Sequence, residues 1–108
     1  MRADVAAFVT TGPLPNWDAD EAQIAHRQAQ LEAITGPVSD AEAAALAQCF
    51  GPDDCYGLAW TLLHLIETGP HPVIAAKPAL GANPWHHTLW MRAVNGGLIA
   101  GTDGRDFR

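Results

Sequence analysis

The sequence is poor in positive charge. It holds six Lys and Arg residues against twelve Asp and Glu residues, which gives a formal net charge of -6 at pH 7 over 108 residues. Proteins that bind nucleic acids neutralise phosphates with clustered Lys and Arg side chains, and the few cations of this chain are scattered. We therefore expect no nucleic-acid partner, and a partner with a basic surface fits the charge better.

The sequence also has few cysteines and no long apolar run. No stretch reaches the roughly 18 apolar residues that span a membrane, and the first residues lack the uninterrupted apolar segment of a signal peptide. We therefore expect a cytoplasmic protein without membrane contact. In that compartment Cys49 and Cys55 are predicted to be reduced thiols, although a disulfide across the intervening Gly51-Pro52 turn is sterically conceivable.

Glycine-proline pairs are the most regular feature present, at positions 12-13, 36-37, 51-52 and 69-70. Glycine can take the left-handed conformation that ends a helix, and the proline after it lacks the amide hydrogen needed to continue one. These pairs predict an all-α fold of about five short helices. The chain length suits one domain, which we place at residues 1–100, followed by a flexible tail at 101–108.

Capping residues predict where several helices begin. The first helix is expected over residues 3–11. Asp18 followed three residues later by Glu21 approximates a capping box for the second helix, whose buried stripe leaves Arg27 on the solvent side. The third helix has the clearest start, because Ser39 and Glu42 fit the S-x-x-E capping box.

Residues 54–68 are the most apolar stretch, and Asp53 is expected to cap the helix that they form. A helix that is apolar over nearly its whole circumference is normally central. We therefore predict that this helix is enclosed by the others. One thin polar strip interrupts it, formed by Gly57, Thr61, His64 and Thr68.

The chain between residues 69 and 83 is rich in proline and glycine, which exclude a regular helix. We expect an irregular crossover there. Asn83 and Pro84 are a favourable N-cap and first-turn pair, and they predict a fifth helix that runs to about Val94.

Residues 39–68 together predict a helical hairpin with a four-residue Gly-Pro-Asp-Asp junction, an alanine-rich first helix and an aliphatic second helix. In this respect the chain resembles one helical pair of a HEAT-type repeat, and the small helical immunity proteins that bacteria make against polymorphic toxins. The resemblance implies a helical binder whose surface blocks a partner protein. It carries over no individual site residue.

Acids and aromatic residues supply the candidate binding site. If helices two to four alternate in direction, the starts of the second and fourth helices lie at the same end of the molecule, where an acidic rim with aromatic side chains can hold a basic protein. Helix capping is the alternative explanation of these acids. Trp85 or Trp90 is a further candidate exposed anchor, and packing in the core is the alternative for both. The predicted partner-binding residues are Trp17, Asp18, Asp20, Glu21, Asp53, Asp54, Tyr56, Trp85 and Trp90.

Reactive or metal-binding groups form no specific motif. The histidines lack the paired spacing of zinc ligands, and no nucleophile accompanies His64. We expect no metal, no cofactor and no enzymatic activity, and a cytoplasmic interaction protein of the immunity or inhibitor kind. The alternatives are a small-molecule or metal-binding domain that uses His64, His86 and the tryptophans, and a subunit that completes an oligomer.

Overall fold

The computed structural model describes residues 1–99. These residues form α-helices, one short 3-10 helix and no strand, so the predicted all-α fold class is confirmed. The predicted tail at 101–108 lies outside the described residues. The elements are α1 (Ala3–Thr11), α2 (Glu21–Ala33), α3 (Asp40–Leu46), η1 (Ala47–Cys49), α4 (Leu58–Ile66) and α5 (Pro84–Asn95).

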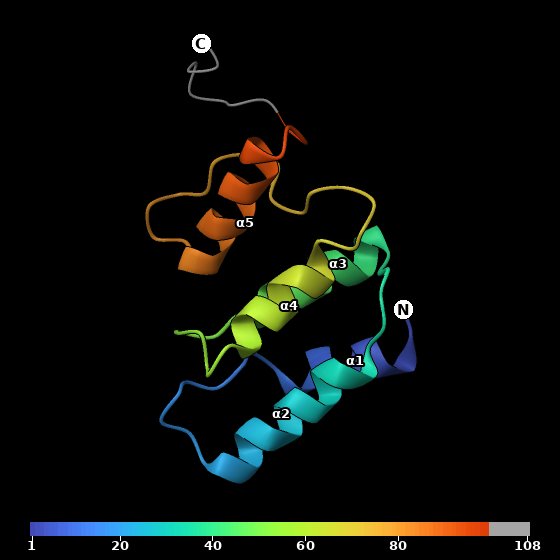
Figure 1. The fold of residues 1–108 in the computed structure, drawn as a ribbon, viewed down its shortest axis with the longest axis vertical. Helices are drawn as coiled ribbons and strands as arrows, with labels where there is room; N and C mark the ends of the chain where they lie inside the picture. Colours follow the sequence, from blue (N-terminus) through green and yellow to red (C-terminus); the bar gives the residue numbers. More distant parts are fainter. Residues whose placement is uncertain (100–108) are drawn as a thin grey trace.

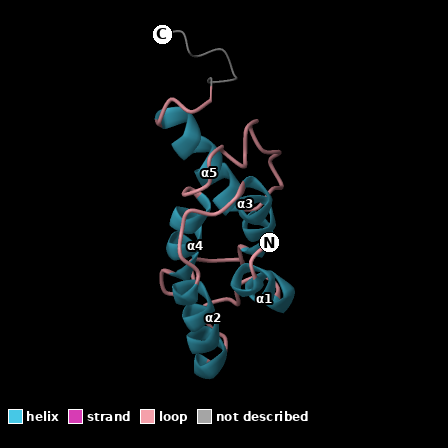
Figure 2. Cartoon of the chain, turned by 90° about the vertical axis from the view of Figure 1, so that its right-hand side faces the viewer, coloured by secondary structure: helices cyan, strands magenta, loops and turns pink. Residues whose placement is uncertain are grey.

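The helices are arranged in three tiers along the long axis of the molecule (Figure 1). The first tier is the pair α1 and α2, and the second is the pair α3 and α4. The tiers meet where α1 packs on α3 and α2 packs on α4, while α5 forms the third tier and packs on α4. The turned view shows that the α5 tier extends beyond the two helical pairs (Figure 2).

Two predicted capping arrangements are confirmed. The Ser39 Oγ accepts a hydrogen bond from the Glu42 amide at 3.1 Å, and Glu42 Oε1 accepts one from the Ser39 amide at 2.9 Å, so the capping box of α3 is complete. At α5, Asn83 Oδ1 accepts a hydrogen bond from the Trp85 amide at 2.8 Å, and Pro84 is the first helical residue. In both helices the capping side chain binds a backbone amide that lies no more than three residues further along the chain.

The predicted start of the second helix is wrong. Residues 17–19 form a turn, and α2 begins at Glu21 with Asp20 as an N-cap whose side chain makes no capping bond. The cause is a hydrogen bond within the turn, in which Asn16 Oδ1 accepts from the Asp18 amide at 3.0 Å. Such local side-chain bonds offer the backbone an alternative to the helix.

The predicted start of the fourth helix at residue 54 is also wrong. Three successive residues, Cys55, Tyr56 and Gly57, have positive φ angles of 46°, 54° and 91°, and the helix begins only at Leu58. Asp53 caps this turn rather than the helix, because its Oδ1 accepts a hydrogen bond from the Cys55 amide at 2.9 Å. The hairpin junction is therefore longer than the predicted four residues.

The core lies between the two helical pairs, and α4 supplies a large part of it. On the opposite side of α4, Trp60, Thr61 and His64 are exposed, so this helix is less enclosed than its composition predicts. The buried core residues that the α-helices contribute are Val5, Phe8, Leu31, Ala43, Leu46, Leu58, Ala59, Leu62, Leu63, Ile66 and Leu89.

Arg27 is buried, which contradicts its predicted place on the solvent side of the second helix. Its guanidinium lies 4.0 Å from the centre of the Phe8 ring and donates hydrogen bonds to the carbonyls of Phe8 and Gly12 at the end of α1. A cation there opposes the negative end of the α1 dipole. Burial lowers the pKa of Arg27, so this side chain ties α2 to α1 at a cost in desolvation.

None of the described helices is both long enough and apolar enough to cross a bilayer.

Candidate functional site

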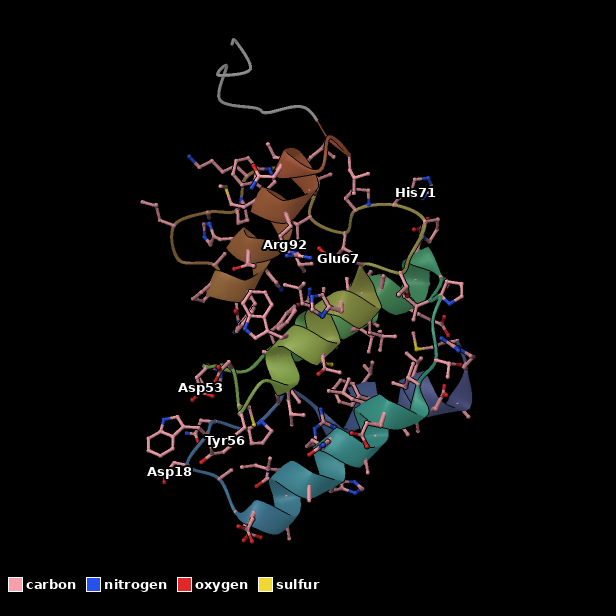
Figure 3. All side chains as sticks on the ribbon, in the orientation of Figure 1. Asp18, Asp53, Tyr56, Glu67, His71 and Arg92 are labelled. Atoms are coloured by element: carbon pink, nitrogen blue, oxygen red, sulfur yellow. The ribbon has the colours of Figure 1, made fainter. Side chains whose placement is uncertain are left out.

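A hydrogen bond joins the two acidic loops of the molecule. The Trp17 amide donates to Asp53 Oδ2 at 3.1 Å, across a sequence separation of 36 residues. The loop before α2 and the turn before α4 therefore lie side by side, as the alternating helix directions predict. Figure 3 shows Asp18, Asp53 and Tyr56 together at this end of the molecule. We call the surface formed by residues 16–21 and 53–57 the acidic end.

The turn at residues 53–57 holds Tyr56 outward. Cys55, which precedes it, is fully buried, whereas the Tyr56 side chain is 69% exposed. The turn is closed by the Gly57 amide, which donates to the Asp54 carbonyl at 3.0 Å. The positive φ angles of Cys55, Tyr56 and Gly57 place three successive residues of this turn in the left-handed region.

The carboxylates of the acidic end have no positive partner among residues 1–99. The ion pairs in that part of the chain lie elsewhere, between Arg2 and Glu42 and between Arg92 and Glu67, and the His71 ring contacts the Asp40 carboxylate. Of the five acids at the acidic end, four are exposed and Asp53 is half-buried. These five are Asp18, Asp20, Glu21, Asp53 and Asp54.

The aromatic residues predicted as anchors divide into two groups. Trp17 is 57% exposed and belongs to the acidic end together with Tyr56. Trp90 is buried, so its predicted role as an exposed anchor is wrong. Trp85 is half-buried, because it stacks on Phe50 at a ring separation of 5.7 Å and meets the Trp60 ring edge-on at 5.0 Å.

A groove runs along α2 beside the acidic end, and sequence reasoning did not find it. It consists of two hollows, of about 150 and 390 Å³, which share Ile24, Gln28 and Tyr56 and therefore adjoin each other. We call it the α2 groove. No sequence pattern marks it, because it exists only where the 53–57 turn approaches α2. Its other lining residues are Ala19, Glu21, Ala25, Leu31, Glu32, Gly57, Leu58 and Thr61.

The histidines named as possible ligands do not converge. His86 Nε2 lies 2.6 Å from the Ala47 carbonyl, so this ring is used in attaching α5 to the second tier. His64 is exposed beside Trp60, with ring centres 6.3 Å apart. Within residues 1–99 no group of three or more His, Cys, Asp and Glu side chains is placed to hold a metal ion.

Both cysteines are free and buried. Burial raises the pKa of the Cys49 thiol, and the nearby Arg27 charge opposes this in part. Burial also raises the pKa of the Cys55 thiol, and the negative charges of Asp53 and Asp54 raise it further. Because the thiolate is the reactive form, neither cysteine is set up as a nucleophile.

A separate cleft of about 390 Å³ lies between the end of α4, the crossover and α5. Its walls are mainly apolar, from Ile66, Val73, Ile74, Leu89 and Ala93. The polar groups at its edge are engaged within the chain, since the Glu67 carboxylate accepts two hydrogen bonds from Arg92 at 2.7 and 2.9 Å (Figure 3). The cleft is lined by neither His64 nor His86.

Comparison of the chain with protein-family models, with curated proteins and with solved structures found no match.

Proposed function

We propose that this protein is a non-enzymatic, cytoplasmic interaction module that masks a basic surface of a partner protein with its acidic end. The resemblance of residues 39–68 to small helical immunity proteins supports a role as an immunity protein or inhibitor. The observation that carries the proposal is the Trp17–Asp53 hydrogen bond, because it gathers the carboxylates and two exposed aromatic rings on one surface.

The main alternative explanation of these acids accounts for few of them. Helix capping would use the carboxylates to bind free backbone amides, yet Asp20 makes no capping bond at α2. Within residues 1–99 the side chains of Asp18, Glu21 and Asp54 make no hydrogen bond either, while Asp53 braces the turn. Their charges are therefore left to act on whatever approaches this end.

The chemistry of the acidic end suits a basic protein partner. Clustered carboxylates steer an oppositely charged protein and raise its association rate. Tyrosine and tryptophan are the residue types that contribute most to binding at the centre of protein interfaces. Trp17 and Tyr56 offer both an apolar surface and a polar group.

The test is capture of partners from the native cytosol, followed by kinetics with any basic protein retained. We expect the double variant Asp18→Asn with Asp54→Asn to associate about tenfold more slowly than the unaltered chain at low salt, and we expect added salt to remove most of that difference. The matched control is Ala3→Lys with Ala7→Lys, which changes the net charge equally at exposed positions of α1. Equal rates for the two variants would sink the proposal.

A small-molecule site is the second candidate function, and the cleft beside α5 is the observation that favours it. Its volume and apolar walls are typical of small-ligand sites. Since the Glu67 and His71 side chains at its edge are already bound to Arg92 and Asp40, which do not line it, an uncharged ligand suits it best. A library of neutral apolar compounds should then raise the melting temperature of the chain, and Ala93→Trp, which fills the cleft, should abolish the effect.

A further inference from the structure

The α2 groove has negative charge at both ends. Glu21 stands at the end beside Ala19, and Glu32 at the end beside Thr61. The two glutamates are eleven residues apart on α2, which is about three turns or roughly 16 Å. No cation of the described residues lines the groove, and the acidic end adjoins it through Tyr56 and Ala19.

The middle of the groove is less polar than its two ends. Ile24 is half-buried and Leu58 is buried, and the Gln28 side chain is bound to Glu32 Oε2 at 3.0 Å. Tyr56 lines both hollows. The ring is 69% exposed, so its apolar face is available to a partner.

We propose that the α2 groove receives one amphipathic helix of the partner, which carries Lys or Arg at two positions eleven residues apart with apolar residues between them. The proposal rests on the proposed function, and it names the element of the basic partner that is recognised. The cations of that helix meet Glu21 and Glu32, and its apolar residues pack on Ile24 and Tyr56. The spacing follows from α2 itself, since a helix laid alongside it has the same rise per residue.

A helix fits this charge pattern better than an extended strand. Eleven residues make close to three full helical turns, so both cations of a helix point to the same face. An extended strand covers about 16 Å in five residues. Residues five apart in a strand point to opposite faces, and one of the two cations would then point away from α2.

The probe for the test is a synthetic 16-residue peptide held helical by a lactam bridge on its outer face. It has alanine at most positions, lysine at the third and fourteenth positions, and leucine at the sixth, seventh and tenth. The control peptide has the same composition, with its lysines moved to the fifth and twelfth positions, which lie on the face opposite the leucines. We expect the full chain to bind the probe about tenfold more tightly than the control in fluorescence anisotropy.

Two variants of equal net charge locate the binding. Glu21→Gln with Glu32→Gln should weaken probe binding about fivefold. The side-chain amide oxygen introduced at position 32 can still accept the hydrogen bond from Gln28. Ala22→Lys with Ala33→Lys alters exposed α2 residues outside the groove and should have a smaller effect. A probe with glutamates in place of its lysines should bind the Glu21→Lys with Glu32→Lys variant in preference to the unaltered chain.

The outcomes separate this inference from the proposed function. Equal binding of the probe and the control peptide, or equal weakening by the two variant pairs, would overturn the groove assignment. A native basic partner whose association depends on Asp18 and Asp54 but not on Glu21 and Glu32 would also overturn it, and it would leave the proposed function standing. Binding of the probe that depends on the groove glutamates and follows the charge exchange supports the inference.

Discussion

The region that contains helices α1 to α4 and the region that follows it are stabilised in different ways. In the four-helix body, residues 3–67, each helical pair buries apolar side chains against the other pair. In the C-terminal arm, residues 68–99, only Leu89, Trp90 and Ala93 are buried, and the Trp90 indole nitrogen has no hydrogen-bond partner among the described residues. The body has a core of its own, whereas the arm depends on the surface that it covers.

Polar bonds and aromatic contacts attach the arm to the body. Asn83 Nδ2 donates to the Gly51 carbonyl at 3.2 Å, His86 binds the Ala47 carbonyl, and the Arg92 side chain binds Glu67 at the end of α4. Exposed ion pairs of this kind contribute little free energy. Stability is therefore expected to be unequal along the chain, with the arm opening more readily than the body.

Truncation of a core leucine should give the largest loss of stability. Leu62 is fully buried in the body, and Leu62→Ala should lower the free energy of unfolding by about 3 kcal/mol, through lost transfer energy and the cavity left behind. Leu80 in the arm is 99% exposed, and Leu80→Ala should change stability by less than about 0.5 kcal/mol. Urea denaturation of both variants measures this contrast. Equal losses in the free energy of unfolding would contradict the prediction.

Removal of the buried cation should have the next largest effect. Arg27→Ala leaves the carbonyls of Phe8 and Gly12 without their donor and empties the space over the Phe8 ring. We expect a loss of about 2 kcal/mol in urea denaturation. Arg27→Lys keeps the charge but lacks the planar fork whose two nitrogens bind the two carbonyls, and its stability should lie between that of Arg27→Ala and that of the unaltered chain. If Arg27→Ala is as stable as the unaltered chain, the bonds from α2 to α1 contribute nothing.

Removal of the side-chain contact between α5 and the end of α4 should destabilise the arm alone. Arg92→Ala removes the two hydrogen bonds to Glu67, and because both side chains are partly exposed we expect a change in global stability below about 1 kcal/mol. Amide hydrogen exchange should become faster in α5 while that in α3 stays unchanged. Thr88→Ala, which alters α5 without touching that pair, is the control. Faster exchange in both helices would mean that arm and body open together.

Mild acid should have the smallest effect on stability. The Glu42 carboxylate of the body stays charged at pH values at which a glutamate is usually protonated. The Arg2 amide, then the Ser39 amide, lower the pKa of Glu42 to about 2. A carboxylate with a lowered folded-state pKa contributes stability that is complete above its unfolded value near 4.5, and the contribution declines as pH falls toward 2. Denaturation midpoints measured at pH 6, 4 and 2.5 should show this decline, and Glu42→Gln should show a shallower one.

Local capping signals predicted the starts of some helices but not others. Ser39 with Glu42 and Asn83 with Pro84 act on amides within three residues, so the sequence alone identified them. The same reasoning failed at residues 18 and 54 because neighbouring Asn16 and Asp53 side chains bind the backbone in turns. An acid ahead of an apolar run is equally compatible with a helix cap and with such a turn.

Long-range contacts explain what else the sequence did not show. Arg27 is buried only because the end of α1 brings two carbonyls to it. The α2 groove likewise depends on Tyr56, which approaches α2 from a turn more than twenty residues further along the chain. The meeting of the two acidic loops could be predicted, because it requires only that short connections make successive helices alternate in direction.

The left-handed turn at Cys55, Tyr56 and Gly57 implies a conflict between durability and recognition. An ordinary side chain held at a φ of 54° costs roughly 1 kcal/mol that glycine would not incur. Tyr56→Gly should therefore yield a chain that withstands more urea while it loses the ring shared by the acidic end and the α2 groove. A protein engineer who selected this fold for robustness alone would select against the side chain that is best placed to touch another molecule.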